Sequence, residues 1–153
     1  MQANRIHLTI DSSLADVFLV GLLVNSACRF VGLDETEAYQ MELCVVEAAN
    51  NTIRHAYNEQ AGHEVAVSLA IFPDRLEFSV ADRGSPISED VLAVLRREAS
   101  ATDYDPFALD QLPRVGMGLE IMREVMDQVD YESSGGGNCL RMTKRIPAPA
   151  PEV

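Results

Sequence analysis

The sequence predicts a single α+β domain, and three observations carry this prediction. The chain has 153 residues, enough for one buried core, and 47% of them are hydrophobic. Two pairs of strand-like runs are joined by short turns, as in β-hairpins. The segments before and between them have the apolar periodicity of helices. We therefore expect one domain over residues 1–146, without internal repeats, followed by a disordered proline-rich tail over residues 147–153.

The first elements are a strand and a helix. Residues 5–10 alternate apolar and polar side chains, which is typical of a half-buried strand. Residues 11–13, Asp-Ser-Ser, are of the types that cap helices, and residues 14–31 have helical periodicity. This helix is apolar on more than one side, so we expect part of it to face another protein chain.

The second helix carries the most informative pair of side chains. Asp34 and Glu37 form a capping box at its start, and it extends to about Tyr57. Glu47 and Asn51 are four residues apart, so both point from one face of the helix, about one turn from each other. In this arrangement the carboxylate of Glu47 can position a hydroxyl, and the carboxamide of Asn51 can hold a hard metal ion. The alternative is that both are solvated surface residues without a functional role.

Two further segments end in glycine-containing turns. Residues 64–72 and 75–81 alternate as the two strands of a hairpin, and the second strand leads into Asp82-Arg83-Gly84. Seen alone, such a sequence is most often a turn. Residues 88–99 predict a short amphipathic helix, which Ser88 caps.

An irregular stretch, residues 100–114, precedes the last helix. Its length and its two prolines favour a functional loop or lid. Gly116 and Gly118 then open a helix that extends to about residue 126, where backbone N–H groups can approach an anion. The chain closes with a hairpin whose strands are residues 129–132 and 139–146.

Composition narrows the possible partners. The chain has 24 acidic and 12 basic residues, a formal net charge of −12. This argues against direct binding to nucleic acid, and it favours a protein partner with a basic surface. A nucleotide is not excluded, because backbone N–H groups and a metal can hold its phosphates. No apolar run is long enough for a membrane span and no signal peptide is evident, so we expect a cytoplasmic protein. We expect Cys28, Cys44 and Cys139 to be buried free thiols.

Three segments in this order resemble the GHKL ATP-binding superfamily: VVEAANNTIRHAY, VADRGSP and GMGLEIMREVMDQVDY. Within it, the chain is similar to the anti-sigma-factor serine/threonine kinases of bacterial partner-switching modules. The resemblance covers residues 5–146. It implies the Bergerat fold, an α+β two-layer sandwich in which a mixed, mostly antiparallel sheet has its helices on one face. ATP would bind between helices and lid.

The resemblance also implies residue roles. Glu47 would be the general base for the incoming serine or threonine hydroxyl, and Asn51 would coordinate Mg²⁺. Asp82 would accept a hydrogen bond from the adenine amino group, while Gly84 gives the base room. Gly116 and Gly118 would present N–H groups to the phosphates. These roles agree with the chemistry of the groups, since Mg²⁺ prefers oxygen ligands and phosphoryl transfer needs mainly positioning.

Neighbouring residues leave alternatives open. Arg114 is a candidate phosphate contact, and Thr143 and Lys144 are candidates for the edge of the adenine pocket. Arg54 and His55 are placed to approach phosphates, or are a solvated arginine and a packed histidine. The acidic residues of the loop at positions 103, 105 and 110 are better explained as solvated charges than as metal ligands.

Two departures from the superfamily bear on function. The first glycine box, DRGSP, lacks the second glycine common in histidine kinases, which fits the anti-sigma branch. Members of that branch often carry a partner-contacting arginine in the first helix, whereas this chain has Phe18 and Leu19 in that region. The partner-binding surface is therefore expected to differ.

The resemblance implies an anti-sigma factor that sequesters a sigma factor and phosphorylates a STAS-domain anti-anti-sigma antagonist. Homodimerisation is suggested by the apolar first strand and helix. Two other hypotheses remain open: a nucleotide-dependent sequestering module without kinase activity, and a detached histidine-kinase catalytic domain. An intact Glu47 disfavours the former, and the DRGSP box disfavours the latter.

Overall fold

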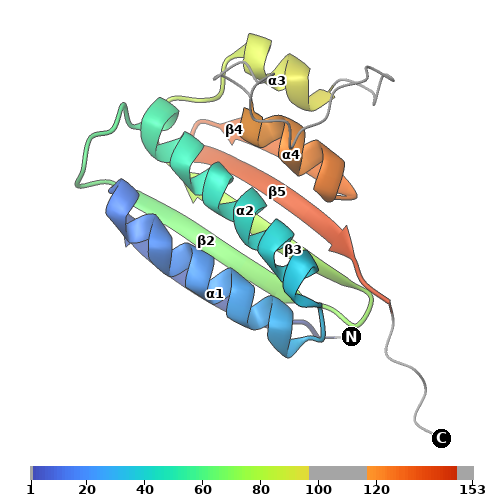
Figure 1. The fold of residues 1–153 in the computed structure, drawn as a ribbon. Helices are drawn as coiled ribbons and strands as arrows, with labels where there is room; N and C mark the ends of the chain where they lie inside the picture. Colours follow the sequence, from blue (N-terminus) through green and yellow to red (C-terminus); the bar gives the residue numbers. More distant parts are fainter. Residues whose placement is uncertain (1, 97–116, 148–153) are drawn as a thin grey trace, which may run out of the picture.

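The computed structural model of the protein describes residues 2–96 and 117–147. Five strands form one sheet in the order β1-β2-β3-β5-β4, and helices α1, α2 and α4 lie over one of its faces (Figure 1). The predicted two-layer α+β class is confirmed. All four strand pairings in the described part are antiparallel, so the sheet is more regular than the mixed sheet that we expected.

The strands are β1 (Asn4–Asp11), β2 (Glu64–Ile71), β3 (Arg75–Asp82), β4 (Gln128–Ser134) and β5 (Gly137–Arg145). Each of the predicted strands is present, with ends within three residues of those expected. The hairpin β2–β3 turns through residues 72–75, where the N–H of Phe72 donates to the carbonyl of Arg75. Because side chains alternate along each strand, every second residue faces the helices and the others face away from them.

The helices are α1 (Val17–Phe30), preceded by a 3₁₀ turn (Leu14–Asp16), α2 (Glu35–Asn51), α3 (Glu89–Arg96) and α4 (Met117–Val125). The predicted capping box of α2 is confirmed. The N–H of Glu37 donates to Asp34 Oδ1 over 2.8 Å, and the N–H of Asp34 donates to Glu37 Oε2 over 3.0 Å. No helix in the described ranges has the length and apolar character to cross a lipid bilayer.

The prediction that residues 11–13 cap the first helix is wrong. Neither Ser13, before the 3₁₀ turn, nor Asp16, before α1, makes a side-chain capping hydrogen bond. The Ser12 hydroxyl instead donates to the carbonyl of Gln60, and Asp11 Oδ1 accepts from the N–H of Gly62. These residues therefore tie the β1–α1 connection to the turn before β2.

One core lies between the helices and the sheet. Its fully buried side chains come from α1 (Val20 and Val24), α2 (Met41 and Val45), the central strands (Val65, Val67, Leu69, Leu76, Phe78 and Met142) and α4 (Met122). Helix α2 lies between α1 and α4, which gives it close neighbours on both sides (Figure 1). The rigid placement of α2 is what positions the predicted Glu47 and Asn51.

After Asn51 the helical path widens into a π-helical turn, η2 (Thr52–Ala56). The N–H of Tyr57 reaches back to the carbonyl of Thr52 over 3.3 Å, the five-residue spacing of a π-turn. The sequence predicts a helix that extends to about residue 57, without a change to π-helical geometry. The predicted lid at residues 100–114 and the tail after residue 147 lie outside the described residues, and the third helix is described to Arg96.

Candidate functional site

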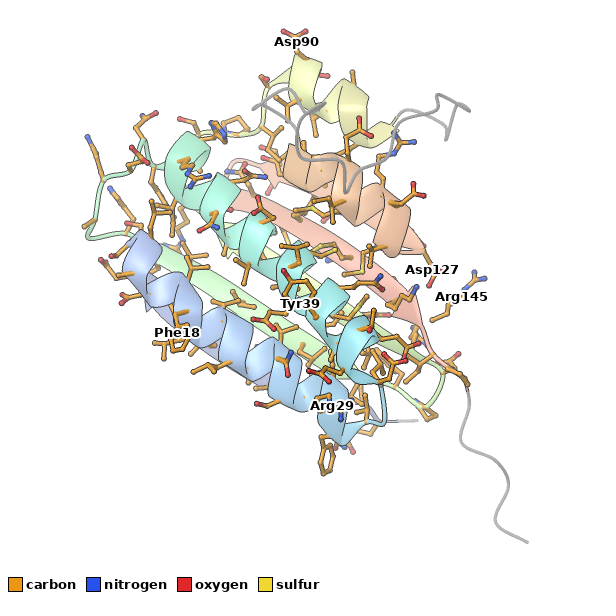
Figure 2. The ribbon with its side chains drawn as sticks, in the orientation of Figure 1. Phe18, Arg29, Tyr39, Asp90, Asp127 and Arg145 are labelled. Carbon is orange, nitrogen blue, oxygen red and sulfur yellow. The ribbon has the colours of Figure 1, made fainter. Side chains whose placement is uncertain are left out.

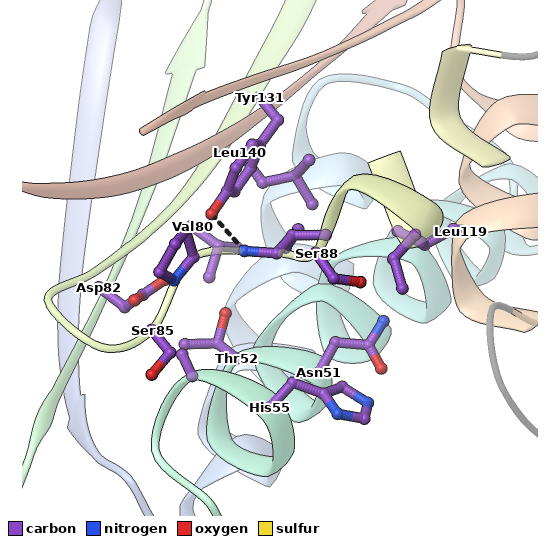
Figure 3. Close-up of a pocket in the computed structure, with 14 residues that line it drawn as sticks. Asn51, Thr52, His55, Val80, Asp82, Ser85, Ser88, Leu119, Tyr131 and Leu140 are labelled. Carbon is purple, nitrogen blue, oxygen red and sulfur yellow. Dashed lines mark hydrogen bonds between the residues drawn. The ribbon is translucent and has the colours of Figure 1, made fainter. Parts of the chain in front are cut away.

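A cavity of about 270 Å³ lies where the end of α2 meets the ends of β3, β4 and β5 (Figure 3). Its volume is near the lower limit of about 300 Å³ that is usual for small-molecule sites, which suits one heterocyclic group better than a whole nucleotide. Both apolar and polar side chains line it. They are Asn51, Thr52, His55, Ala56, Val80, Asp82, Ser85, Pro86, Ile87, Ser88, Val91, Leu119, Tyr131 and Leu140.

Glu47 and Asn51 meet the first turn of α4 together. A Cβ added to Gly118 would lie 2.9 Å from Glu47 Oε2 and 3.4 Å from Asn51 Nδ2. The two side chains therefore share one face of α2, as their spacing predicted. Asn51 lines the cavity, and Glu47 lies one turn farther back, outside the lining. Neither side chain has a hydrogen-bond partner among the described residues, so both polar groups are available to a ligand.

Asp82 ends β3 and lines the opposite side of the cavity. Its Oδ1 accepts from the N–H of Gly84 and from Asn138 Nδ2, each over 2.9 Å. Asn138 is directly opposite Asp82 in the β3–β5 pairing. Asn138 was not among the predicted site residues. Only the pairing of the end of β3 with β5 brings it to Asp82.

Gly84 is required by close packing against the π-turn. A Cβ at this position would contact the backbone oxygen of Ala56 and lie 2.7 Å from its carbonyl carbon. The N–H of Ser85 then donates to that same carbonyl over 3.0 Å. Glycine was expected at position 84 because it leaves room for the adenine base. The structure shows a second reason that the sequence did not reveal, namely the close approach of two backbone segments.

Two tyrosines brace the loop that follows Asp82. Tyr57 is buried, and its hydroxyl donates to the carbonyl of Glu64 over 2.7 Å and accepts from the N–H of Arg83 over 2.9 Å. The Tyr131 hydroxyl accepts from the N–H of Ile87 over 2.9 Å (Figure 3). Burial raises the pKa of Tyr131, whereas the bond from Ile87 lowers it, and the net shift is upward. Tyr131 therefore stays a neutral phenol in the cavity wall.

Thr143 does not join the site, which corrects the prediction. Leu140 and Met142 face the helices, so the alternation of β5 sends Thr143 to the other face of the sheet, between Glu77 of β3 and Gln128 of β4. Lys144 faces the helices, but its Nζ donates to the carbonyl of Val125 at the end of α4.

The remaining predicted contacts divide between the cavity and the rest of the chain. His55 lines the cavity, whereas Arg54 is exposed outside it. Arg114 and Gly116 lie outside the described residues. Glu47, Asn51, Asp82, Gly84 and Gly118 are thus the predicted residues that the fold brings to one region.

The described side chains at the site can hold a metal ion only if a bound ligand supplies further oxygen atoms. No three His, Cys, Asp or Glu side chains in residues 2–96 and 117–147 gather in a metal-binding cluster. Mg²⁺ holds few protein ligands and keeps waters and phosphate oxygens, so a single amide oxygen from Asn51 fits it. Asn51 lies beside Gly118 of α4 and has no hydrogen-bond partner in residues 2–96 and 117–147, so it is compatible with a metal that arrives with phosphates.

Comparison with known proteins agrees with the predicted motifs. The profile of the histidine kinase-like ATPase domain matches residues 10–144. "Serine-protein kinase RsbW" of Bacillus velezensis is 31% identical over 144 residues, which cover 94% of this chain and 86% of the relative. The protein of the same name from Bacillus subtilis is 29% identical over 145 residues, 94% of this chain and 87% of that one.

Solved structures share the fold. The RsbU and RsbW domains of Rv1364c from Mycobacterium tuberculosis align with a TM-score of 0.64 and 17% identity over 96% of this chain, which spans 33% of that one. The mycobacterial sensor histidine kinase MprB aligns with a TM-score of 0.50 and 19% identity, over 90% of this chain and 97% of that one. On the profile match over residues 10–144 and the 31% identity over 94% of its length, this chain belongs to the histidine kinase-like ATPase family, in the branch of the RsbW-type serine-protein kinases.

Proposed function

We propose that the protein is an ATP-dependent protein-serine/threonine kinase and anti-sigma factor. It would phosphorylate a STAS-domain anti-anti-sigma antagonist and sequester a sigma factor. The observation that carries the kinase proposal is the placement of Glu47 and Asn51 side by side against Gly118, without a hydrogen-bond partner among the described residues, next to a cavity that Asp82 lines. Two RsbW relatives named as serine-protein kinases support the choice of hydroxyl acceptor.

The residues would divide the reaction between the two ends of the cavity. Asp82 would bind the adenine amino group of the substrate ATP, since a carboxylate oxygen is a pure acceptor. Glu47 would remove the proton of the acceptor hydroxyl while that oxygen bonds to the γ-phosphorus and ADP leaves with the bridging oxygen. Mg²⁺ held at Asn51 would neutralise phosphate charge, which is the main requirement of phosphoryl transfer.

An apolar patch on α1 supports the proposed contact with a protein partner. Phe18, Leu19 and Leu22 are 69%, 49% and 50% exposed, and Figure 2 shows Phe18 on the outer side of α1. Clustered exposed apolar side chains mark interaction sites. The helix is therefore apolar on two sides, as expected. We propose that this α1 patch contacts the sigma factor or a second copy of the chain.

The decisive experiment measures phosphoryl transfer from Mg²⁺-ATP to STAS proteins encoded near this gene. We expect acid-stable label, as for phosphoserine or phosphothreonine, and a loss of at least ~100-fold in Glu47→Gln, the scale of a lost general base. Glu42→Gln is the matched control, because Glu42 is on the same helix but bonds to Asn25 away from the cavity.

The outcomes separate the three hypotheses. Acid-labile label would support phosphohistidine chemistry instead. ATP binding without transfer to any STAS protein would favour a sequestering module. Equal rates for Glu47→Gln and wild type would remove Glu47 from the mechanism.

A further inference from the structure

Asn138 is a buried polar residue next to the candidate site. The residue is only 5% exposed. Among the described residues, Ser12 is the other polar residue that is buried. A buried amide that is left without hydrogen-bond partners destabilises the folded state. We therefore expect its donors and its acceptor to be used, and the hydrogen bonds around it bear this out.

The amide of Asn138 makes three hydrogen bonds. Its Nδ2 donates to Asp82 Oδ1 and to the carbonyl of Gly84, each over 2.9 Å. Its Oδ1 accepts from the Ser133 hydroxyl over 2.7 Å. Two acceptors on one side and a hydroxyl on the other fix which end of the amide is nitrogen. Both N–H groups of the amide are then occupied.

This bonding leaves Asp82 with two unlike oxygens. Oδ1 accepts from both Gly84 and Asn138, whereas no donor in the described ranges reaches Oδ2. Rotating the carboxylate would break two hydrogen bonds inside the site. One oxygen is therefore committed to the protein, and the other is left for a ligand in the cavity that Asp82 lines.

We infer that Asn138 is the positioning residue that sets base selectivity: by holding one oxygen of Asp82, it presents the other to the C6 amino group of adenine. The inference rests on the proposed binding of ATP. Adenine offers an amino donor at the ring position where guanine carries a carbonyl. A carboxylate repels that carbonyl, since both are acceptors. A carboxylate free to turn would discriminate less.

Asn138→Asp tests this with little change of shape. The variant removes both N–H donors and places a carboxylate against the oxygens of Asp82 and Gly84. Asn25→Asp is a matched control, because Asn25 Nδ2 also donates to a carboxylate, Glu42 Oε2, over 2.8 Å, on the α1–α2 contact. Both variants create the same pair of acidic groups, but only one of them does so at the cavity.

Isothermal titration calorimetry with ATP and with GTP, each with excess Mg²⁺, supplies a readout independent of catalysis. We expect wild type and Asn25→Asp to prefer ATP to the same extent. We expect Asn138→Asp to bind ATP at least ~10-fold more weakly and to lose at least ~10-fold of the ATP preference, the scale of a hydrogen bond to a charged group. A loss of affinity for both nucleotides in equal proportion would overturn the selectivity role.

The remaining outcomes are also decisive. Wild type that binds neither nucleotide overturns the proposed function and the inference together. Wild type that binds ATP, with Asn138→Asp equal to Asn25→Asp, overturns the inference alone. If thermal melts show that Asn138→Asp does not fold, Ser133→Ala decides, because Ser133 is exposed and only orients the amide. We expect its ATP preference to fall ~3-fold at an unchanged melting temperature, and an unchanged preference would overturn the inference.

Discussion

The two ends of the candidate site are built in opposite ways. At the proposed base end, Asp82, Gly84 and Asn138 are joined by hydrogen bonds of 2.9 Å, and Ser133 extends this network. At the proposed transfer end, Glu47 and Asn51 touch Gly118 without a hydrogen-bond partner among the described residues.

This difference fits the proposed function, in which one end recognises the base and the other carries the reaction. A satisfied network is rigid and presents one geometry, which suits discrimination between ligands. Unpaired polar side chains gain their partners from the ligand, which suits groups that must bind a metal or move a proton. Substitutions at the base end should therefore affect folding and selectivity, and those at the transfer end should affect ligand binding and rate.

Gly84→Ala tests the base end and has the largest expected effect on stability. The new Cβ would meet the backbone of Ala56, which cannot move without disturbing the π-turn. We expect a loss of about 3 kcal/mol in unfolding free energy, the upper range for overpacking. Urea unfolding measures it, and a stability within 0.5 kcal/mol of wild type, about the scatter of surface substitutions, would contradict the rigid packing of this end.

Gly118→Ala tests the transfer end. Its Cβ would lie 2.9 Å from Glu47 Oε2 and 3.0 Å from Glu47 Cβ, so the side chain must shift. Alanine gains about 1 kcal/mol of helix propensity over glycine, which offsets the strain. We expect near-normal stability and ATP binding weakened about 10-fold, measured by calorimetry, on the scale of a small displacement of positioning groups.

A matched glycine on α1 serves as the control. A Cβ on Gly21 would lie 3.1 Å from Glu42 Oε1, so this glycine also packs against a glutamate of α2, but away from the cavity. Gly21→Ala should leave ATP affinity unchanged. If both variants bound ATP equally weakly, any disturbance of α2 would lower the affinity. The contrast between the two ends of the site would then be contradicted.

The thiol of Cys44 gives a smaller, pH-dependent test of the support below the transfer end. Burial raises its pKa from 9.0 to about 12, with a lowering contribution from Lys144 and a raising one from Glu47. The folded state thus favours the protonated thiol. The contribution of this pKa shift to the free energy of unfolding is fully present below pH 9.0. It declines as the pH rises toward 12, by at most about 1.4 kcal/mol per pH unit.

Urea unfolding at pH 8 and pH 10 measures this contribution. We expect the difference in stability between the two pH values to be smaller in Cys44→Ala than in wild type, since all other titrating groups are shared. Equal differences would show that Cys44 titrates normally, and that α2 opens readily to solvent at the transfer end.

The sequence predicted the transfer end better than the base end for a physical reason. Glu47 and Asn51 are neighbours on one helix, so their spacing alone places them together. Asp82 and Asn138 meet only through the pairing of β3 with β5, and no local pattern encodes that contact. The anti-sigma kinase resemblance named Asp82 but not its partner.

Two further differences have similar causes. Thr143 was placed at the cavity from its position on the last strand, but the alternation of Leu140 and Met142 assigns it to the other face. The π-turn was missed because the helical periodicity of residues 35–57 continues through it. In both cases the structure is determined by the path of the backbone, which the residue types alone do not predict.

The pairing of Asp82 with Asn138 also has a consequence for the order in which the protein is made. β1 and β2 are joined across both long helices, and β3 is paired with a strand whose first residues come more than 50 positions later. A nascent chain emerging at roughly 5–20 residues per second therefore completes its helical layer while Asp82 still lacks its amide partner. The proposed base end is therefore the last part of the site to be assembled, and a translation product that stops before β5 would keep Glu47 and Asn51 but lack Asn138, the residue that we infer sets base selectivity.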